Sequence, residues 1–238
     1  MESDDHMYDL SNFAVTRRWP PRHPERIQYY GVPSPNGVKV SIMLEETGLA
    51  YEAHRVDIGA GDQATPEFLS LNPYGKIPAI IDPCRPDGPL GLWDSGAILI
   101  YLAEKTGRFL SSHPQERHHT LQWLLWQASA VGPIFGQVGF FHKFAGREIA
   151  DRRPLDHYAK ESRRLLEVLE GRLADRRWIM GDAYSIADIA TLGWIRNLIR
   201  FYDAAGLVDY HSLKRVPAWL DAGLSRPAVA RGLQVCAE

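Results

Sequence analysis

The residue run Lys-Ile-Pro-Ala-Ile at positions 76–80 contains the groups needed to hold an extended peptide by its backbone. The run predicts a turn that enters an apolar strand through the bond between Ile77 and Pro78. We expect this bond to be cis and to precede an edge strand, which would leave the backbone N–H and C=O of Ile77 free to pair with a peptide. A purely structural turn is the other interpretation of Pro78, and the two are compatible.

A second run, Asp-Ser-Gly-Ala-Ile at positions 94–98, predicts a strand end that turns into a helix. Asp94 and Ser95 would supply a carboxylate and a hydroxyl at the start of that helix. A helix N-terminus offers unpaired N–H groups and a partial positive charge, which suit a small carboxylate. Together the two runs predict a site for a short peptide with a free α-carboxylate, and glutathione is such a peptide.

The elements that must position these residues follow an α/β order in the first part of the chain. The predicted strands are 27–30, 51–58, 79–81 and 90–93, and the predicted helices are 38–48, 66–71 and 95–106. The order β-α-β, then a short helix, then β-β-α with a proline before the third strand, is typical of a thioredoxin-like domain.

From Pro114 onward the sequence has long helical patterns and no convincing strand. Ser185 and Asp188 have the spacing of a capping box that closes the start of a helix, so we expect Asp188 to be structural. We therefore expect three regions: an extended N-terminal arm with little structure of its own (1–26), a thioredoxin-like α/β domain (27–110) and an all-helical C-terminal domain (114–238).

Composition argues against several classes of function. The chain of 238 residues has a net charge of −2, which gives no electrostatic footprint for nucleic acid and no polybasic patch for a membrane. Residues 118–142 lack charged side chains but contain Gly132, Pro133 and several glutamines, so we expect a buried helix with a break there rather than a membrane span. The histidines lack the spacing of metal ligands, and no glycine-rich phosphate loop is present.

The two cysteines, Cys84 and Cys236, lie far apart and form no CxxC pair. This spacing fits neither a disulfide scaffold nor a zinc ribbon, and a reducing, cytoplasmic environment fits it best. We interpret Cys84, in an Asp-Pro-Cys turn, as an incidental surface thiol.

Taken in order, these motifs resemble the glutathione transferase family over residues 27–232. The loop Ser34-Pro35-Asn36-Gly37 narrows the resemblance to the bacterial Nu class, whose relatives include disulfide-bond reductases and fungal Ure2-like proteins. That class typically has Thr-Pro-Asn-Gly here, so the serine keeps the hydroxyl. Asp94 stands where the class often has Glu, and His157 stands where it tends to have Arg, a change whose effect on ligand binding stays open.

The resemblance implies roles for individual residues. Ser34 and Asn36 would donate hydrogen bonds to the glutathione sulfur, because a hydroxyl, an amide and the N–H groups of a helix start all favour thiolate over thiol. An ordinary capped turn is the alternative. The other implied contacts are the backbone of Ile77 beside Pro78 for the cysteinyl unit, Asp94 for the γ-glutamyl amine, Ser95 for its carboxylate, and Gln63 and Lys76 for the glycine end. Helix capping is the alternative for Asp94 and Ser95, and a solvated charge is the alternative for Lys76.

No cysteine occupies the loop at 34–37, so a covalent glutaredoxin-like cycle cannot run from residue 34. Any thiol chemistry should then belong to bound glutathione as co-substrate, without a metal. The resemblance favours a glutathione-dependent disulfide reductase. A glutathione-conjugating transferase acting on electrophiles would start from the same thiolate, and a non-catalytic protein-binding module of the same fold is the third possibility. The resemblance also implies a homodimer, in which residues 121–141 would form part of the dimer face and the site wall unless they are simply core.

Overall fold

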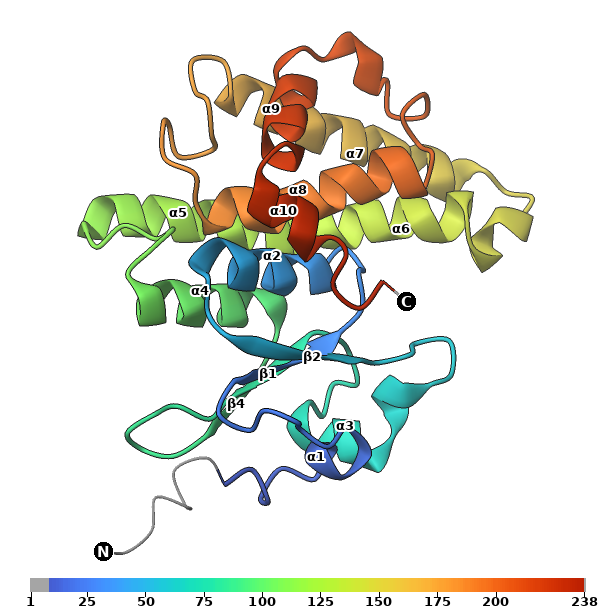
Figure 1. The fold of residues 1–238 in the computed structure, drawn as a ribbon. Helices are drawn as coiled ribbons and strands as arrows, with labels where there is room; N and C mark the ends of the chain where they lie inside the picture. The colour runs from blue at the N-terminus through green and yellow to red at the C-terminus, as the bar shows by residue number, and fades with distance from the viewer. Residues whose placement is uncertain (1–8, 238) are drawn as a thin grey trace, which may run out of the picture. The chain divides into compact units, whose positions relative to one another are not determined.

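The computed structural model describes residues 9–237, and its contacts divide the chain into two compact units (Figure 1). One unit contains residues 1–102 together with 228–238, and the other contains residues 103–227. The domain ranges 27–110 and 114–238 remain predictions. The end of the chain, from Ala228 onward, is grouped with the first unit, where Ser41 Oγ donates a hydrogen bond to Gly232 O at 2.7 Å.

A four-stranded sheet forms the centre of the first unit. Its strands are β1 (Ile27–Gly31), β2 (Tyr51–Arg55), β3 (Ala79–Asp82) and β4 (Leu90–Trp93), in the spatial order β2-β1-β3-β4. β2 runs parallel to β1, whereas β3 is antiparallel to both β1 and β4. Every residue of β1 and β3 is buried, including the polar side chains of Gln28 and Asp82, because these are the two inner strands of the sheet.

The bond between Ile77 and Pro78 is cis, as the sequence predicted. The edge position expected for the following strand is wrong, because β3 lies between β1 and β4 and the edges of the sheet are β2 and β4. The hairpin partner β4 occupies the side of β3 that an edge strand would leave open. The free backbone groups of the predicted site therefore belong to the turn before β3.

Helices cover both faces of this sheet (Figure 1). α2 (Gly37–Thr47) and α4 (Ser95–Thr106) lie on one face, and α1 (Val15–Arg18) and α3 (Pro66–Leu71) lie on the other. α2 ends at Gly48, whose φ of +73° is the left-handed conformation that glycine adopts at helix C-caps. α10 (Pro227–Gly232) packs directly against α2, since a Cβ on Gly232 would lie 2.7 Å from the backbone of Ile42.

The N-terminal segment is more ordered than the sequence predicted. Residues 1–8 of the expected arm lie outside the described residues, but the remainder contains α1 and buries Leu10 and Val15. These two side chains join a hydrophobic cluster that includes Tyr30 and Phe68, and Trp19 packs against it. The expectation of an arm with little structure is wrong for this part, because apolar side chains spaced along a polar, proline-rich segment gain free energy by covering the sheet.

The second unit consists of helices and connecting turns. Its α-helices are α5 (Pro114–Trp126), α6 (Gly132–His142), α7 (Arg153–Arg172), α8 (Ile186–Arg196) and α9 (Arg215–Leu224). The π-helical segments Gln127–Val131 and Asn197–Phe201 continue α5 and α8. The break expected near Gly132 and Pro133 is wrong: the chain stays helical from Pro114 to His142, and a π-helical segment ends where Pro133 has no N–H to donate to the preceding turn.

Asp188 has the structural role predicted for it. The capping box at the start of α8 is complete, and the fully buried carboxylate accepts hydrogen bonds from Ile179 N–H at 2.9 Å, Ser185 N–H at 3.0 Å and Trp219 Nε1–H at 2.9 Å. One side chain therefore joins three separate segments of the helical unit.

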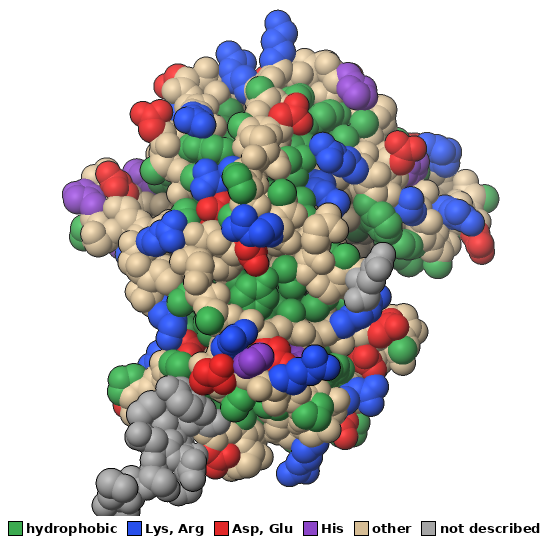
Figure 2. All heavy atoms as spheres, viewed as in Figure 1, with side chains coloured by type: hydrophobic (Ala, Val, Ile, Leu, Met, Phe, Trp, Pro, Cys, Tyr) green, Lys and Arg blue, Asp and Glu red, His purple; other side chains and the backbone are tan. Residues whose placement is uncertain are grey.

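Within residues 9–237, no helix is both long and apolar enough to cross a membrane. Figure 2 shows basic and acidic side chains interspersed over the visible face, in line with the nearly balanced composition.

Candidate active site

A cavity of about 330 Å³ opens in the first unit where three turns of the chain meet. Its lining residues are Asn36, Asn72, Tyr74, Lys76, Ile77, Pro78, Trp93, Asp94 and Ser95. Most of the residues singled out from the sequence are among them, whereas Ser34 and Gln63 are not. The cavity therefore joins the two sequence runs that were predicted separately, at 76–80 and at 94–98.

A larger cavity of about 770 Å³ lies in the helical unit, between the start of α5 and the residues that lead into α8. None of the predicted site residues lines it. We assign the site to the smaller cavity because its lining combines three features. These are the backbone of Ile77, the start of α4 at Ser95, and the charged side chains of Lys76 and Asp94.

The loop before α2 presents Asn36 to the cavity and uses Ser34 to close the helix start. Ser34 Oγ accepts a hydrogen bond from Gly37 N–H at 3.0 Å, and Ser34 O accepts one from Val38 N–H at 2.9 Å. The capping role that was the alternative interpretation of Ser34 is thus observed. It occupies only a lone pair of the hydroxyl oxygen, so the O–H remains able to donate to a ligand.

Asn72 builds the turn that carries Lys76 to Pro78. Its side chain is buried, its Nδ2 donates to Lys76 O, and its Oδ1 accepts from Tyr74 N–H at 2.9 Å. The Ile77 backbone makes no hydrogen bond with a described residue, which agrees with a role in binding an extended peptide. Asn72 was not predicted as a site residue, although its position in an Asn-Pro dipeptide marks it as a turn former.

Asp94 caps α4 and still faces the cavity. Its φ is +71°, and its Oδ1 accepts hydrogen bonds from Gly96 N–H at 2.9 Å and Ala97 N–H at 3.1 Å. Its Oδ2 accepts no hydrogen bond from a described residue. Capping therefore uses only one of the two oxygens of this carboxylate.

Ser95 has a neighbour that the sequence analysis missed. Lys39, on α2, is buried, and its Nζ lies 3.2 Å from Ser95 Oγ. Burial lowers the pKa of Lys39 to about 7, while the nearby Asp94 acts in the opposite direction. A lysine in the otherwise uncharged run from Val38 to Leu44 was the available signal, because charged side chains are rarely buried without a partner or a function.

Gln63 lies in a short 3-10 helix, Asp62–Ala64, beside the cavity rather than in its lining. Its backbone carbonyl would lie 3.4 Å from a Cβ on Gly75, the residue before Lys76. Its side-chain Oε1 is buried and has no hydrogen-bond partner among the described residues. A buried carboxamide oxygen without a donor is costly, so this group is poised to accept a hydrogen bond.

The cavity contains no cysteine in its lining. Both Cys84 and Cys236 are free thiols, and Cys84 is exposed. The described part of the chain holds no cluster of three or more side chains able to bind a metal ion.

Comparison with known proteins identifies the family. The model of the glutathione S-transferase N-terminal domain matches residues 25–104, and that of the C-terminal domain matches residues 139–227. The disulfide-bond oxidoreductase YfcG of Escherichia coli (strain K12) is 44% identical over 209 residues, covering 87% of this chain and 94% of that protein. The chain belongs to the glutathione S-transferase family. A second relative from the same organism, the disulfide-bond oxidoreductase YghU, is 40% identical over 219 residues. The match covers 89% of this chain and 74% of YghU.

Solved structures of this family have the same fold. A glutathione transferase from Pseudomonas putida, with one glutathione disulfide bound per subunit, matches with a TM-score of 0.94 at 56% identity and covers 95% of this chain and 99% of its own. One from Burkholderia graminis, with two glutathione molecules bound per subunit, matches with a TM-score of 0.95 at 58% identity and covers 98% and 97%. The predicted combination of a thioredoxin-like domain and an all-helical domain is confirmed.

Proposed function

We propose that the protein is a glutathione-dependent disulfide reductase of the Nu class. The observation that carries the proposal is the cavity that joins Asn36, the free backbone of Ile77 and the Asp94–Ser95 pair, beside a loop without cysteine. Relatives named disulfide-bond oxidoreductases, at 44% and 40% identity, support the reaction type. Neighbouring structures that hold glutathione or its disulfide support the ligand.

In the proposed binding mode the ligand takes up groups that the protein leaves open. The backbone of Ile77 pairs with the cysteinyl unit, beside the cis Pro78. Asp94 Oδ2 accepts from the γ-glutamyl ammonium, and Ser95 Oγ donates to the γ-glutamyl carboxylate at the start of α4. At the glycine end, Lys76 binds the carboxylate and Gln63 Oε1 accepts from the glycine N–H.

The proposed reaction is thiol–disulfide exchange in two steps. The thiolate of bound glutathione, stabilised by Ser34 Oγ–H, the Asn36 amide and the N-terminus of α2, attacks one sulfur of a disulfide. A mixed disulfide forms and the other sulfur leaves as a thiolate that takes up a proton. The thiolate of a second glutathione attacks the mixed disulfide at the glutathione sulfur, which gives glutathione disulfide and a second free thiol. Two glutathiones are oxidised for each disulfide reduced, and the protein supplies alignment and thiolate stabilisation.

Reduction of 2-hydroxyethyl disulfide by glutathione, coupled to glutathione reductase and NADPH, tests the proposal. We expect an enzyme-dependent rate. We expect S34A and N36A each to lower turnover by about a hundredfold, the loss typical when one donor that stabilises the reacting charge is removed. S70A, which removes an exposed hydroxyl on α3, is the matched control. Turnover that is unchanged in S34A and N36A would remove both residues from the reaction.

Two other experimental outcomes would assign a different function to the protein. A rate with aromatic halides or epoxides but none with disulfides would make the protein a conjugating transferase, because both reactions begin from the same thiolate. Failure to bind glutathione in calorimetry would leave a non-catalytic binding module of the same fold.

We further propose that the protein is a cytoplasmic homodimer. Leu125 on α5 and Phe140 on α6 are 61% and 41% exposed, and large apolar side chains left open on helices are suited to a subunit interface. Analytical ultracentrifugation of L125D would test the dimer: we expect dissociation to monomers.

A further inference from the structure

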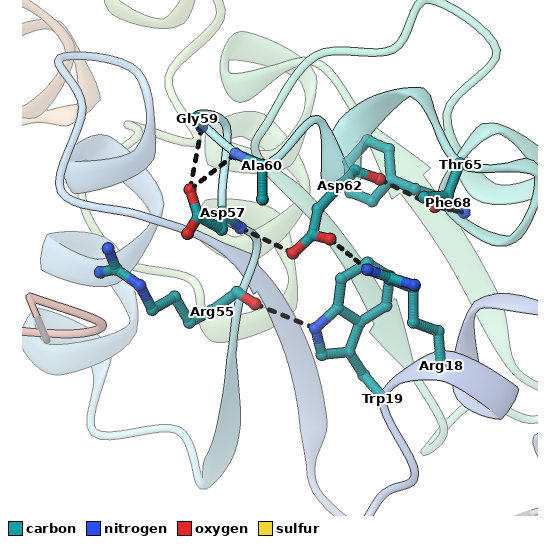
Figure 3. A network of polar contacts seen from close by, with 9 residues as sticks. All are labelled: Arg18, Trp19, Arg55, Asp57, Gly59, Ala60, Asp62, Thr65 and Phe68. Carbon is teal, nitrogen blue, oxygen red and sulfur yellow. Dashed lines mark hydrogen bonds and ion pairs between the residues drawn. The ribbon is translucent and has the colours of Figure 1, made fainter.

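Arg18, at the end of α1, forms an ion pair with Asp62 that joins segments 44 positions apart in sequence (Figure 3). The Arg18 side chain is 43% exposed and the Asp62 side chain only 12%. Burial alone would raise the pKa of Asp62, but hydrogen bonds from Asp57 N–H and the Arg18 guanidinium hold it below its usual value. The carboxylate is therefore charged at neutral pH and bonded on both oxygens.

Asp62 closes the loop formed by residues 57–65. Its Oδ2 accepts from Asp57 N–H at 2.9 Å, and Asp57 Oδ1 in turn accepts from Gly59 N–H at 2.9 Å and Ala60 N–H at 3.1 Å (Figure 3). Thr65 Oγ1 donates to Asp62 O at 2.8 Å and caps the start of α3. The position of Asp62 thus fixes the shape of the whole loop.

Trp19 attaches the same N-terminal segment to both ends of this loop. Its Nε1–H donates to Arg55 O at 2.9 Å, at the end of β2, and its ring meets Phe68 of α3 edge-on at 6.3 Å between centroids (Figure 3). Trp19 orients the segment, and Arg18 reaches the carboxylate at the centre of the loop.

The loop carries Gln63, which follows Asp62 directly. The buried Oε1 of Gln63 lacks a partner, and the Gln63 backbone carbonyl lies against Gly75, next to Lys76 in the cavity lining. Any displacement of Asp62 would move both groups.

We propose that Arg18 is a positioning residue for glutathione binding, acting through Asp62 on Gln63. The inference rests on the proposed function and assigns to the N-terminal segment a part in building the site, although Arg18 itself does not line the cavity. Arg18 touches no reacting atom, so it sets the affinity for the glycine end of glutathione and leaves the thiolate chemistry unchanged.

Calorimetric titration of the full-length protein with glutathione tests the inference. R18A should raise the Kd by about five- to tenfold, the lower range of coupling between sites, and R18K should recover part of the loss. In the coupled disulfide assay R18A should raise the KM for glutathione and leave kcat unchanged. R17A is the matched control, since Arg17 is an exposed arginine of the same helix that forms no ion pair with a described residue.

A double-mutant cycle separates positioning from a general loss of stability. If Arg18 acts through Gln63, R18A should have no further effect on the Kd in a Q63A background, because the two changes remove one interaction. D62N keeps an acceptor for Asp57 N–H and removes the charge that Arg18 meets, so it should raise the Kd as R18A does, even if R18A folds poorly. Equal affinities for R18A, D62N and the parent protein would overturn the inference and leave the proposed function standing. A parent protein that binds no glutathione would overturn both.

Discussion

The ammonium group of Lys39 lies 3.2 Å from the hydroxyl of Ser95, although only 2% of the lysine is exposed. Ser95 lines the cavity, whereas Lys39, on α2, does not. A carboxylate bound at Ser95 would thus meet a buried cation through one intervening oxygen. In a medium of low dielectric such a charge acts more strongly than an exposed lysine could.

Burial lowers the pKa of Lys39 to about 7, so we expect glutathione binding at Ser95 to depend on pH. A bound carboxylate favours the charged ammonium, so binding takes up a proton near neutral pH and weakens as the pH rises past 7. We expect the Kd of S-methylglutathione, which has no ionisable thiol, to rise above pH 7 by up to about tenfold per pH unit, the limit for one linked proton.

Calorimetry in buffers of different ionisation enthalpy would count the protons directly. In K39M the proton uptake should vanish, and the Kd should be weaker and flat between about pH 6 and 8. Asp94 is the charged neighbour that raises the pKa of Lys39. A pH dependence that survives in K39M would assign the proton to another group.

The same burial predicts that Lys39 destabilises the fold. In the unfolded chain its pKa returns to 10.5, so between pH 7 and 10.5 the unfolded state holds a proton that the folded state lacks, and stability rises with pH. The destabilisation is therefore largest below pH 7. K39M should raise the free energy of unfolding by about 1–4 kcal/mol at pH 6, as expected when a well-packed apolar side chain replaces a buried charge.

Urea denaturation at two pH values would check this. The gain from K39M should be smaller at pH 9 than at pH 6, while K160M, at an exposed position of α7, should give no gain that depends on pH. A gain that is equal at both pH values would mean that Lys39 keeps its ordinary pKa in the folded protein.

Local sequence signals predicted most of the fold because they act over a few residues. The strand and helix order of the first part, the cis bond before Pro78 and the capping box at Ser185 all follow from residues adjacent in sequence. The two runs at 76–80 and 94–98 pointed to one ligand by their chemistry, and the cavity joins them.

The features that could not be predicted from the sequence depend on contacts between residues that are distant along the chain. The inner position of β3 follows from its pairing with β1, which begins more than forty residues earlier in the chain. The N-terminal segment adopts a defined structure because Leu10 and Val15 pack into the cluster that contains Tyr30 and Phe68. Lys39 becomes a candidate for the site only when Ser95, 56 positions away, is seen beside it.

Removal of the Asp188 side chain should destabilise the helical unit severely. D188A would leave the N–H donors of Ile179, Ser185 and Trp219 buried without an acceptor. We expect the free energy of unfolding to fall by about 3–5 kcal/mol, the range for removing one partner from a buried charged interaction. Denaturation followed by tryptophan fluorescence measures the loss, and D182A, at an exposed position, is the control. A loss no larger than in D182A would show that the network contributes little.

Gly37 cannot accept a side chain without moving the start of α2. A Cβ at this position would lie 2.0 Å from Val32 O, a backbone atom that cannot rotate away. G37A should therefore displace the loop that holds Ser34 and Asn36, and so the groups proposed to stabilise the thiolate. We expect disulfide reductase turnover to fall by about a hundredfold, as when catalytic groups shift by about an ångström.

The stability of G37A distinguishes this local effect from unfolding. Overpacking at one backbone contact should cost about 1–3 kcal/mol, which leaves the protein folded at room temperature. G171A, in α7, introduces the same methyl group where nothing lies within 4 Å, and it should leave both turnover and stability intact because alanine is a better helix former than glycine. Turnover of G37A close to that of the parent would show that the loop tolerates the displacement, and would weaken the assignment of thiolate stabilisation to Ser34 and Asn36.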